Sequence, residues 1–148
     1  MYEVERRAGS GRSPAQPGRY RSIVSERELA LAREALEAWR RGDFSRVEAL
    51  LEPRATWHWW EAGDWDCTNR DDIIRTLRER YEQGFGRADM ELVDGGAGGV
   101  IVVSHPSEIG GDEWPEESAT VLSFEGEKIV AMKDYPTRDE ALAAVGSR

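Results

Sequence analysis

The chain separates helical periodicity in its first half from consecutive strand patterns in its second half, and this separation most constrains its fold. Up to residue 84, apolar residues recur mainly three and four positions apart, interrupted by one aromatic, β-prone segment at residues 55–61. Between residues 90 and 134, short apolar runs follow one another with glycine-containing turns. Consecutive strands of this kind form an antiparallel sheet with helices segregated to one face. The pattern therefore predicts an α+β domain whose curved sheet leaves a hollow over its helices.

Two helices are predicted before the first strand. Ser25 and Glu28 have the spacing of a capping box, and Gly42 is placed to end the first helix. Asp43 can cap the second helix, which Pro53 is expected to stop. Each helix has one apolar face, formed by Leu29, Ala32, Leu36 and Trp39 in the first and by Phe44, Val47, Leu50 and Leu51 in the second.

A third helix begins after Thr68 or Asn69 and ends at Gly84, and Thr137 with Glu140 forms a capping box for a short C-terminal helix. The strands of the second half are predicted at residues 90–93, 100–105, 119–124 and 128–134. A long acidic loop at residues 106–117 separates the second of these strands from the third.

Composition fits one domain of 148 residues without disulfides, since Cys67 is the only cysteine. Residues 1–22 contain glycine, proline and arginine without periodicity and are predicted to be a flexible N-terminal extension, so the domain spans 23–148. A net charge of −9 argues against nucleic acid and anionic membranes as partners. Without an apolar signal or membrane-length segment, we expect a cytoplasmic protein.

Several segments, in this order and spacing, resemble the NTF2-like superfamily and its SnoaL-like domain proteins. They are RGDF at 41–44 with Val47, Leu50 and Leu51, TWHW at 56–59, NRDDII at 69–74, GEKIVAMKDY at 126–135 and RDEAL at 138–142. The resemblance implies a cone-shaped fold, with a strongly bent sheet wrapped over three helices, and often a homodimer formed through the sheet. It also implies a cavity that family members use as ketosteroid isomerases, polyketide cyclases, epoxide hydrolases or dehydratases, or for binding without catalysis.

Asp134 is the first candidate for chemistry in such a cavity. Alternation along its strand places Val130, Met132 and Asp134 on one side, and Lys133 on the side that seeks water. A carboxyl group among tryptophan and methionine has a raised pKa, which suits a general acid or base near neutral pH. The alternative is that Asp134 only pairs with an arginine or caps the strand end.

His58 and His105 are further catalytic candidates because imidazole titrates near neutral pH, although a histidine on a strand is more often a structural partner. The predicted pocket wall consists of large side chains that could equally be ordinary core, namely Trp39, Trp57, Trp59, Tyr81 and Met132. No spacing of histidine, cysteine and carboxylates predicts a metal site, and no cofactor is expected.

Three functions remain open from the sequence. The first is an enzyme that transfers protons on an apolar substrate, using Asp134 with His58 or His105. The second is a non-catalytic module that binds a small apolar ligand, and the third is a dimeric interaction module. A titratable group inside an aromatic cavity would favour the first.

Overall fold

The computed structural model describes residues 17–61, 63–96 and 99–146, and it contains one curved sheet with helices on both faces. The first part of the chain forms α1 (Pro17–Arg40), α2 (Phe44–Leu50), β2 (Leu51–His58), α3 (Arg70–Glu82) and the 3-10 turn η1 (Phe85–Arg87). The second part forms β3 (Met90–Asp94), β4 (Val100–Ser104), α4 (Ser107–Gly110), β5 (Ser118–Glu125), β6 (Lys128–Tyr135) and α5 (Arg138–Gly146). The α+β class and the cone-shaped fold predicted from the sequence are confirmed.

The sheet has the strand order β2-β6-β5-β4-β3. Three of its four pairings are antiparallel, as the consecutive strands β3 to β6 predict, whereas β2 lies parallel to β6 at one edge. The parallel pairing is possible because α3 and the strands after it intervene between β2 and β6 in the chain. It places the tryptophan-rich end of β2 beside the acidic end of β6, since Trp57 pairs with Met132.

Helix α1 differs from its prediction at the N-terminal end, because it begins at Pro17 and not at Ser25. Proline is favoured in the first turn of a helix, where its missing N–H group is not needed, and the Ser25 and Glu28 pair lies inside the helix. Residues 1–16 of the predicted extension lie outside the described part of the chain.

The other helix ends follow the predicted caps. Asp43 accepts a hydrogen bond from the Arg46 backbone N–H, and Asn69 accepts one from that of Asp72. Strand β2 begins directly after α2, at Leu51 and before Pro53, because the burial of Leu51 in the sheet already requires extended backbone. No described helix is long and apolar enough to cross a membrane.

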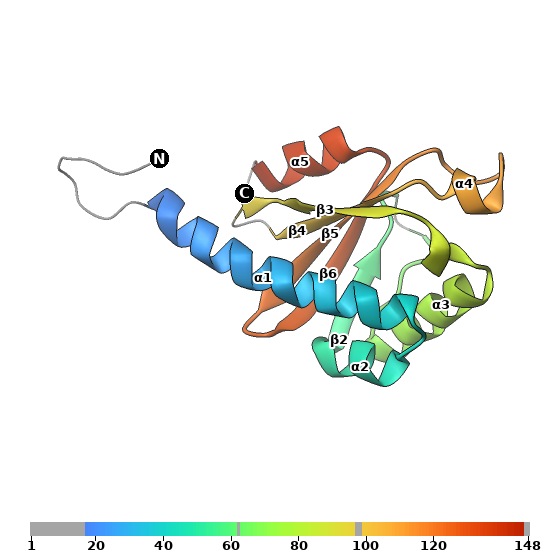
Figure 1. Ribbon diagram of the computed structural model, residues 1–148, viewed down its shortest axis with the longest axis horizontal. Coiled ribbons are helices and arrows are strands. Elements are labelled where there is room, and N and C mark those ends of the chain that lie inside the picture. The colour runs from blue at the N-terminus through green and yellow to red at the C-terminus, as the bar shows by residue number, and fades with distance from the viewer. Residues whose placement is uncertain (1–16, 62, 97–98, 147–148) are drawn as a thin grey trace.

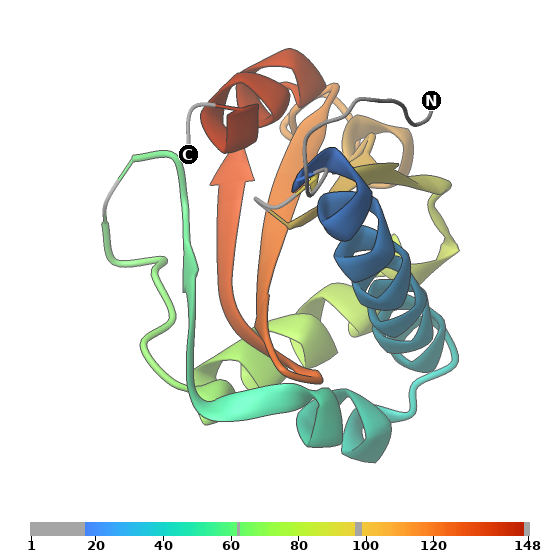
Figure 2. The same ribbon diagram turned by 90° about the vertical axis from the view of Figure 1, so that its left-hand side faces the viewer.

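Two hydrophobic clusters lie on opposite faces of the sheet. The inner cluster joins the concave face to α1, α2 and α3, with Ala32, Trp39, Ile73 and Leu122 among its buried residues. Figure 2 shows α1 (blue) and α3 (yellow-green) to the right of and below the sheet strands, and α5 (red) at the top. The outer cluster packs α5 against β4 and β5 through fully buried side chains, including Ile101. Part of the sheet face through which the resemblance implies a dimer is therefore covered by α5.

Candidate functional site

A cavity of about 560 Å³ lies between the concave face of the sheet and the helices that cover it. Apolar and aromatic side chains supply most of its wall, with a smaller number of polar groups from β4, β5, β6 and α3. The volume lies within the range of about 300–1,000 Å³ that is typical of small-molecule sites. A concave, mainly apolar chamber with a few convergent polar groups is the usual form of a binding site for a small apolar molecule.

Asp134 lies on the cavity side of β6, together with Met132, as the alternation predicts. The alternation does not continue toward the start of the strand, since the register shifts between Ser123 and Phe124 of β5. Ser123 pairs with Ala131, and Phe124 pairs with Ile129, so Val130 is the extra residue of a β-bulge. Ile129 therefore lines the cavity, where the sequence places Val130.

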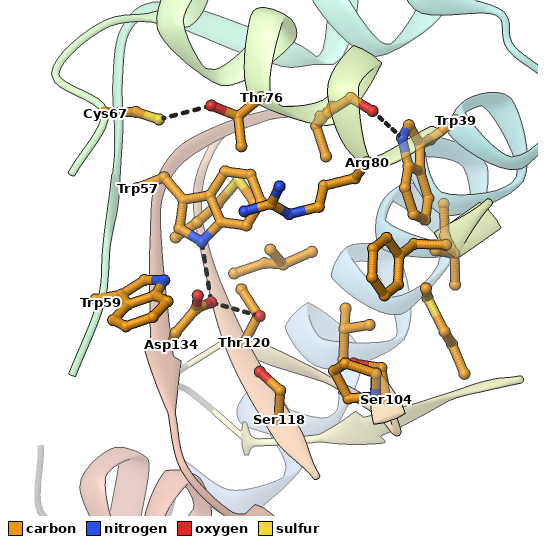
Figure 3. A pocket seen from close by; sticks show the side chains of 18 of the residues that line it. Trp39, Trp57, Trp59, Cys67, Thr76, Arg80, Ser104, Ser118, Thr120 and Asp134 are labelled. Carbon is orange, nitrogen blue, oxygen red and sulfur yellow. Dashed lines mark hydrogen bonds between the residues drawn. The ribbon is translucent and has the colours of Figure 1, made fainter. Parts of the chain in front are cut away.

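Both hydrogen bonds to the carboxyl group of Asp134 are made to one of its two oxygen atoms. Its Oδ1 accepts hydrogen bonds from Trp57 Nε1 at 2.9 Å and from Thr120 Oγ1 at 2.6 Å (Figure 3). Within the described part of the chain, Oδ2 accepts no hydrogen bond. It is also not completely buried, since the completely buried side-chain atoms without a partner do not include it. Oδ2 is thus the oxygen available to a ligand.

Burial of Asp134, whose residue is only 6% exposed, raises the pKa of its carboxyl group. Burial disfavours the charged form because the apolar surroundings replace water. The hydrogen bonds from Thr120 and Trp57, and the positive charges of Arg80 and Lys133, oppose this effect without cancelling it. The site therefore holds a carboxylate that is more basic than an ordinary aspartate.

Hydroxyl groups extend the polar part of the cavity beyond Asp134. In the sheet register, Thr120 faces Asp134, and Ser118 faces Ser104. Figure 3 shows these four side chains along one side of the cavity. In the described part of the chain, the hydroxyl groups of Ser104 and Ser118 make no hydrogen bond, and neither hydroxyl group is completely buried. Both can therefore donate to a ligand.

These hydroxyl residues, and Arg80, were not among the residues that sequence reasoning selected. A weak signal existed, because Ser118 and Thr120 alternate with buried residues in a strand, and Arg80 is seven positions after the buried Ile73 on α3. Arg80 lines the cavity, and its guanidinium carbon lies 5.0 Å from the centre of the Trp114 ring. Glu79 and Glu113 also line the cavity.

The aromatic wall contains most of the side chains predicted for it. Trp39, Trp57, Trp59 and Met132 line the cavity, and Trp39 is fixed by a hydrogen bond from its Nε1 to the backbone oxygen of Leu77 at 2.8 Å. The face of β2 that carries Trp57 is therefore the inner face.

Three of the predicted site residues do not line the cavity. His58 points to the opposite side of β2 from Trp57, where its Nδ1 lies 2.8 Å from Asp66 Oδ2. His105 follows the end of β4, and its Nδ1 lies 2.9 Å from the backbone oxygen of Glu116. Both histidines have structural partners, and neither lines the cavity that contains Asp134.

Tyr81 also lies away from the cavity, because α3 turns its side chain toward α2. Its ring meets Phe44 edge-on, with 5.5 Å between centres, and a Cβ at Gly42 would lie 3.0 Å from its hydroxyl oxygen. The periodicity with Ile74 and Leu77 correctly indicates packing for Tyr81, but against a neighbouring helix.

Among the described residues, no group of three or more histidine, cysteine and carboxylate side chains could hold a metal ion. Cys67 lines the cavity beside Thr76, with 3.5 Å between Sγ and Oγ1, and burial raises the pKa of its thiol. A thiol with a raised pKa is a poor nucleophile near neutral pH.

Solved structures share this architecture. A protein of unknown function from Burkholderia xenovorans LB400, described as NTF-2 like, has a TM-score of 0.58 at 16% identity over 74% of this chain and 82% of its own. A protein from Kribbella flavida, provisionally named a ketosteroid isomerase, has a TM-score of 0.56 at 16% identity, covering 74% and 76%. One from Xanthomonas campestris pv. campestris, provisionally named a polyketide cyclase, has a TM-score of 0.53 at 15% identity, covering 82% and 98%.

At these identities the likeness shows a shared fold, and no curated protein matches the sequence. The family itself follows from the sequence model of the SnoaL-like domain, which matches residues 32–132. The matched region contains the end of α1, the whole inner face of β2 and β6 up to Met132, and most of the cavity wall described above. The chain therefore belongs to the SnoaL-like family, within the NTF2-like fold.

Proposed function

We propose that this protein is an enzyme that transfers a proton on a small, apolar, uncharged carbonyl compound, with Asp134 as the base. The observation that carries the proposal is the asymmetry of one buried carboxyl group. Oδ1 is fixed by Trp57 and Thr120, and Oδ2 is left without a hydrogen bond on the cavity side. A positioned carboxylate with one free oxygen and a raised pKa is suited to general base catalysis.

In the proposed step, Asp134 Oδ2 takes a proton from the carbon next to the substrate's carbonyl group. The electron pair of the broken C–H bond forms the C=C bond of an enolate, and the carbonyl oxygen gains the negative charge. Asp134 then returns the proton to another carbon. Alternatively, the enolate carbon attacks a second carbonyl group and closes a ring, and the alkoxide formed there takes the proton back from Asp134. Neither route changes the oxidation state of the substrate, so no redox partner is needed.

Stabilisation of the enolate oxygen falls to donors that are free in the cavity. Thr120 and Trp57 already donate to Asp134, which leaves the hydroxyl groups of Ser104 and Ser118. The guanidinium group of Arg80 donates to Gln83 Oε1 through Nη1 and has further N–H groups for the enolate oxygen. Donors placed where charge develops can contribute a large part of the rate enhancement. The apolar wall would orient the substrate and keep water from competing for the proton.

The names of two fold neighbours agree with this class of reaction. The Kribbella flavida protein is provisionally named a ketosteroid isomerase, and the Xanthomonas campestris protein a polyketide cyclase. Because the neighbours share only about 15–16% identity with this chain, their names support the proposal only through the fold.

The test is deuterium exchange at the carbon next to the carbonyl group, followed by NMR in deuterated water for a panel of neutral ring ketones. Wild-type protein should accelerate exchange for at least one ketone, and Asp134→Asn should lower that acceleration about 100-fold or more. Asp139→Asn, an exposed carboxylate on α5, is the matched control and should exchange at the wild-type rate. Equal exchange by wild type and Asp134→Asn would remove Asp134 from the chemistry.

A non-catalytic binding module is the second candidate, and the position of the histidines favours it. With His58 and His105 both outside the cavity, Asp134 has no histidine to relay its proton. A binding module would bind a ketone from the panel with equal affinity in wild type and Asp134→Asn, and would accelerate exchange for none of them.

A further inference from the structure

Three tryptophans form a stack at the rim of the cavity, just beyond β2. Trp59 contacts both other rings, lying 4.9 Å from Trp60 at an interplanar angle of 11° and 6.4 Å from Trp65 at 26°. All three side chains line the same cavity as Asp134. We call Trp59, Trp60 and Trp65 the tryptophan stack.

The backbone beneath the stack is held in place by polar contacts with side chains and with the neighbouring segment at residues 66–67. The Trp59 backbone N–H donates to Asp66 Oδ1 at 3.1 Å, and Lys133 Nζ donates to the Trp59 backbone oxygen at 2.6 Å. Asp66 is fixed in turn by His58, and Cys67 exchanges two backbone hydrogen bonds with Trp57, at 2.8 and 2.9 Å. Because the backbone that carries the rings is fixed, less chain freedom is lost when a ligand binds to them.

The outermost ring is exposed in a way that packing does not explain. Trp65 is 71% exposed, and the other large exposed apolar side chain of the described residues, Tyr81, lies away from the cavity. In the described part of the chain, no hydrogen bond uses the indole nitrogen of Trp59, Trp60 or Trp65. An exposed apolar patch that continues a cavity wall marks a place where a ligand is covered.

We propose that the tryptophan stack is an outer subsite that binds the flat face of a fused aromatic ring system. This inference rests on the proposed function, since it assigns the reacting end of the same ligand to Asp134. Flat rings add to an existing stack because offset parallel aromatic rings attract one another. The ligand would therefore extend from Asp134 to the rim of the cavity, with its ring system lying against Trp65.

Charge and hydrogen-bonding capacity narrow the ligand class further. Among the described residues, the charged side chains that line the cavity are three carboxylates, on Glu79, Glu113 and Asp134, and one guanidinium group, on Arg80. This balance disfavours an anionic ligand. A sugar would also use an aromatic platform, but its hydroxyl groups need several polar partners, and the stack offers only indole N–H donors. An uncharged fused-ring compound fits both conditions.

The test compares a short and a long probe. 1-Tetralone has two rings and would occupy the part of the cavity beside Asp134, whereas benzanthrone is a planar four-ring ketone that we expect to extend to Trp65. Binding is measured by calorimetry for the first and by the probe's own fluorescence for the second. Trp65→Ala should weaken benzanthrone binding about three- to tenfold and leave 1-tetralone binding within about twofold. Tyr81→Ala, the exposed aromatic residue away from the cavity, is the control and should change neither affinity.

Equal benzanthrone affinity in wild type and Trp65→Ala would overturn the subsite. A wild-type dimer that becomes monomeric in Trp65→Ala, measured by sedimentation, would also overturn it, because the stack would then cover a second copy of the chain. The readout is binding alone, because benzanthrone has no hydrogen next to its carbonyl group that could be exchanged. A protein that binds benzanthrone through Trp65 but accelerates exchange for none of the enolisable ketones of the panel, 1-tetralone among them, would refute the proposed function and keep the subsite.

Discussion

The two faces of the sheet use the same strands for opposite purposes. On the outer face, Ile101, Val103, Ala119 and Val121 pack against α5 and are almost completely buried. On the inner face, the neighbouring positions of the same strands include Val102, Ser104, Ser118 and Thr120, which line a hollow. The difference shows that the outer face is closely packed in this region, whereas the inner face gives up some packing around the cavity, where polar groups lie.

The largest expected change in the free energy of unfolding comes from truncating one of two adjacent valines on β4, Val103, and it is compared with truncation of the other, Val102. Val103→Ala removes a side chain that is 3% exposed in the outer cluster, and it should lower the free energy of unfolding by about 2 kcal/mol. Val102→Ala removes the same atoms from the cavity wall, where the half-buried side chain has fewer partners, and should cost less than about 1 kcal/mol. Denaturant unfolding of both variants makes the comparison, and equal losses would contradict it.

Asp134→Asn should stabilise the protein near neutral pH, by about 0.5–2 kcal/mol, the range common for stabilising replacements. The amide oxygen can still accept from Trp57 and Thr120, but no charge is buried. Because folding raises the pKa of Asp134, the wild type loses stability relative to the variant as pH rises through that pKa. The gain should disappear below the unfolded pKa of about 3.9, as thermal unfolding against pH would show. A variant less stable at neutral pH would contradict this account.

Thr120→Val removes the shorter of the two hydrogen bonds to Asp134 and should destabilise the protein by about 1 kcal/mol. That bond lowers the pKa of Asp134, so its loss should raise the pKa further and move the acid limb of the exchange reaction to higher pH. The pH dependence of ketone exchange measures the shift. Ser123→Ala, on the same strand but not on the cavity wall, is the control and should leave the limb where it is.

The smallest effect is expected for His58→Asn, on the solvent side of β2. The side chain is half exposed and pairs with Asp66, and exposed pairs of this kind contribute only about 0.2–1 kcal/mol. Exchange catalysed by Asp134 should stay within about twofold of wild type. A loss of exchange comparable to that of Asp134→Asn would return His58 to the reacting centre.

Local patterns predicted the fold well because they act within a few residues. The caps at Asp43 and Asn69, the apolar face of α1 and the strand alternation that turns Asp134 inward all follow from periodicity and hydrogen-bonding chemistry. The start of α1 was not predicted, because the helix runs past an internal capping pair back to Pro17.

Relations between distant segments were beyond local patterns. The parallel contact of β2 with β6 brings Trp57 to Asp134, and these residues are 77 positions apart. The bulge at Val130 turns Ile129 toward the cavity in place of Val130, and it depends on how β6 pairs with β5. His58 and His105 carry the right chemistry, but their positions depend on which strand face is inner, and that is decided by tertiary packing.

The central claim is that Asp134 is a buried carboxyl group whose free oxygen faces a cavity. Its most direct test is the titration of that carboxyl group by carbon-13 NMR, with the signal assigned through Asp134→Asn. The account predicts a pKa above the ordinary aspartate value of about 3.9, and a further change when a ketone from the panel is bound. A pKa at or below that ordinary value, unaffected by any ligand, would contradict it.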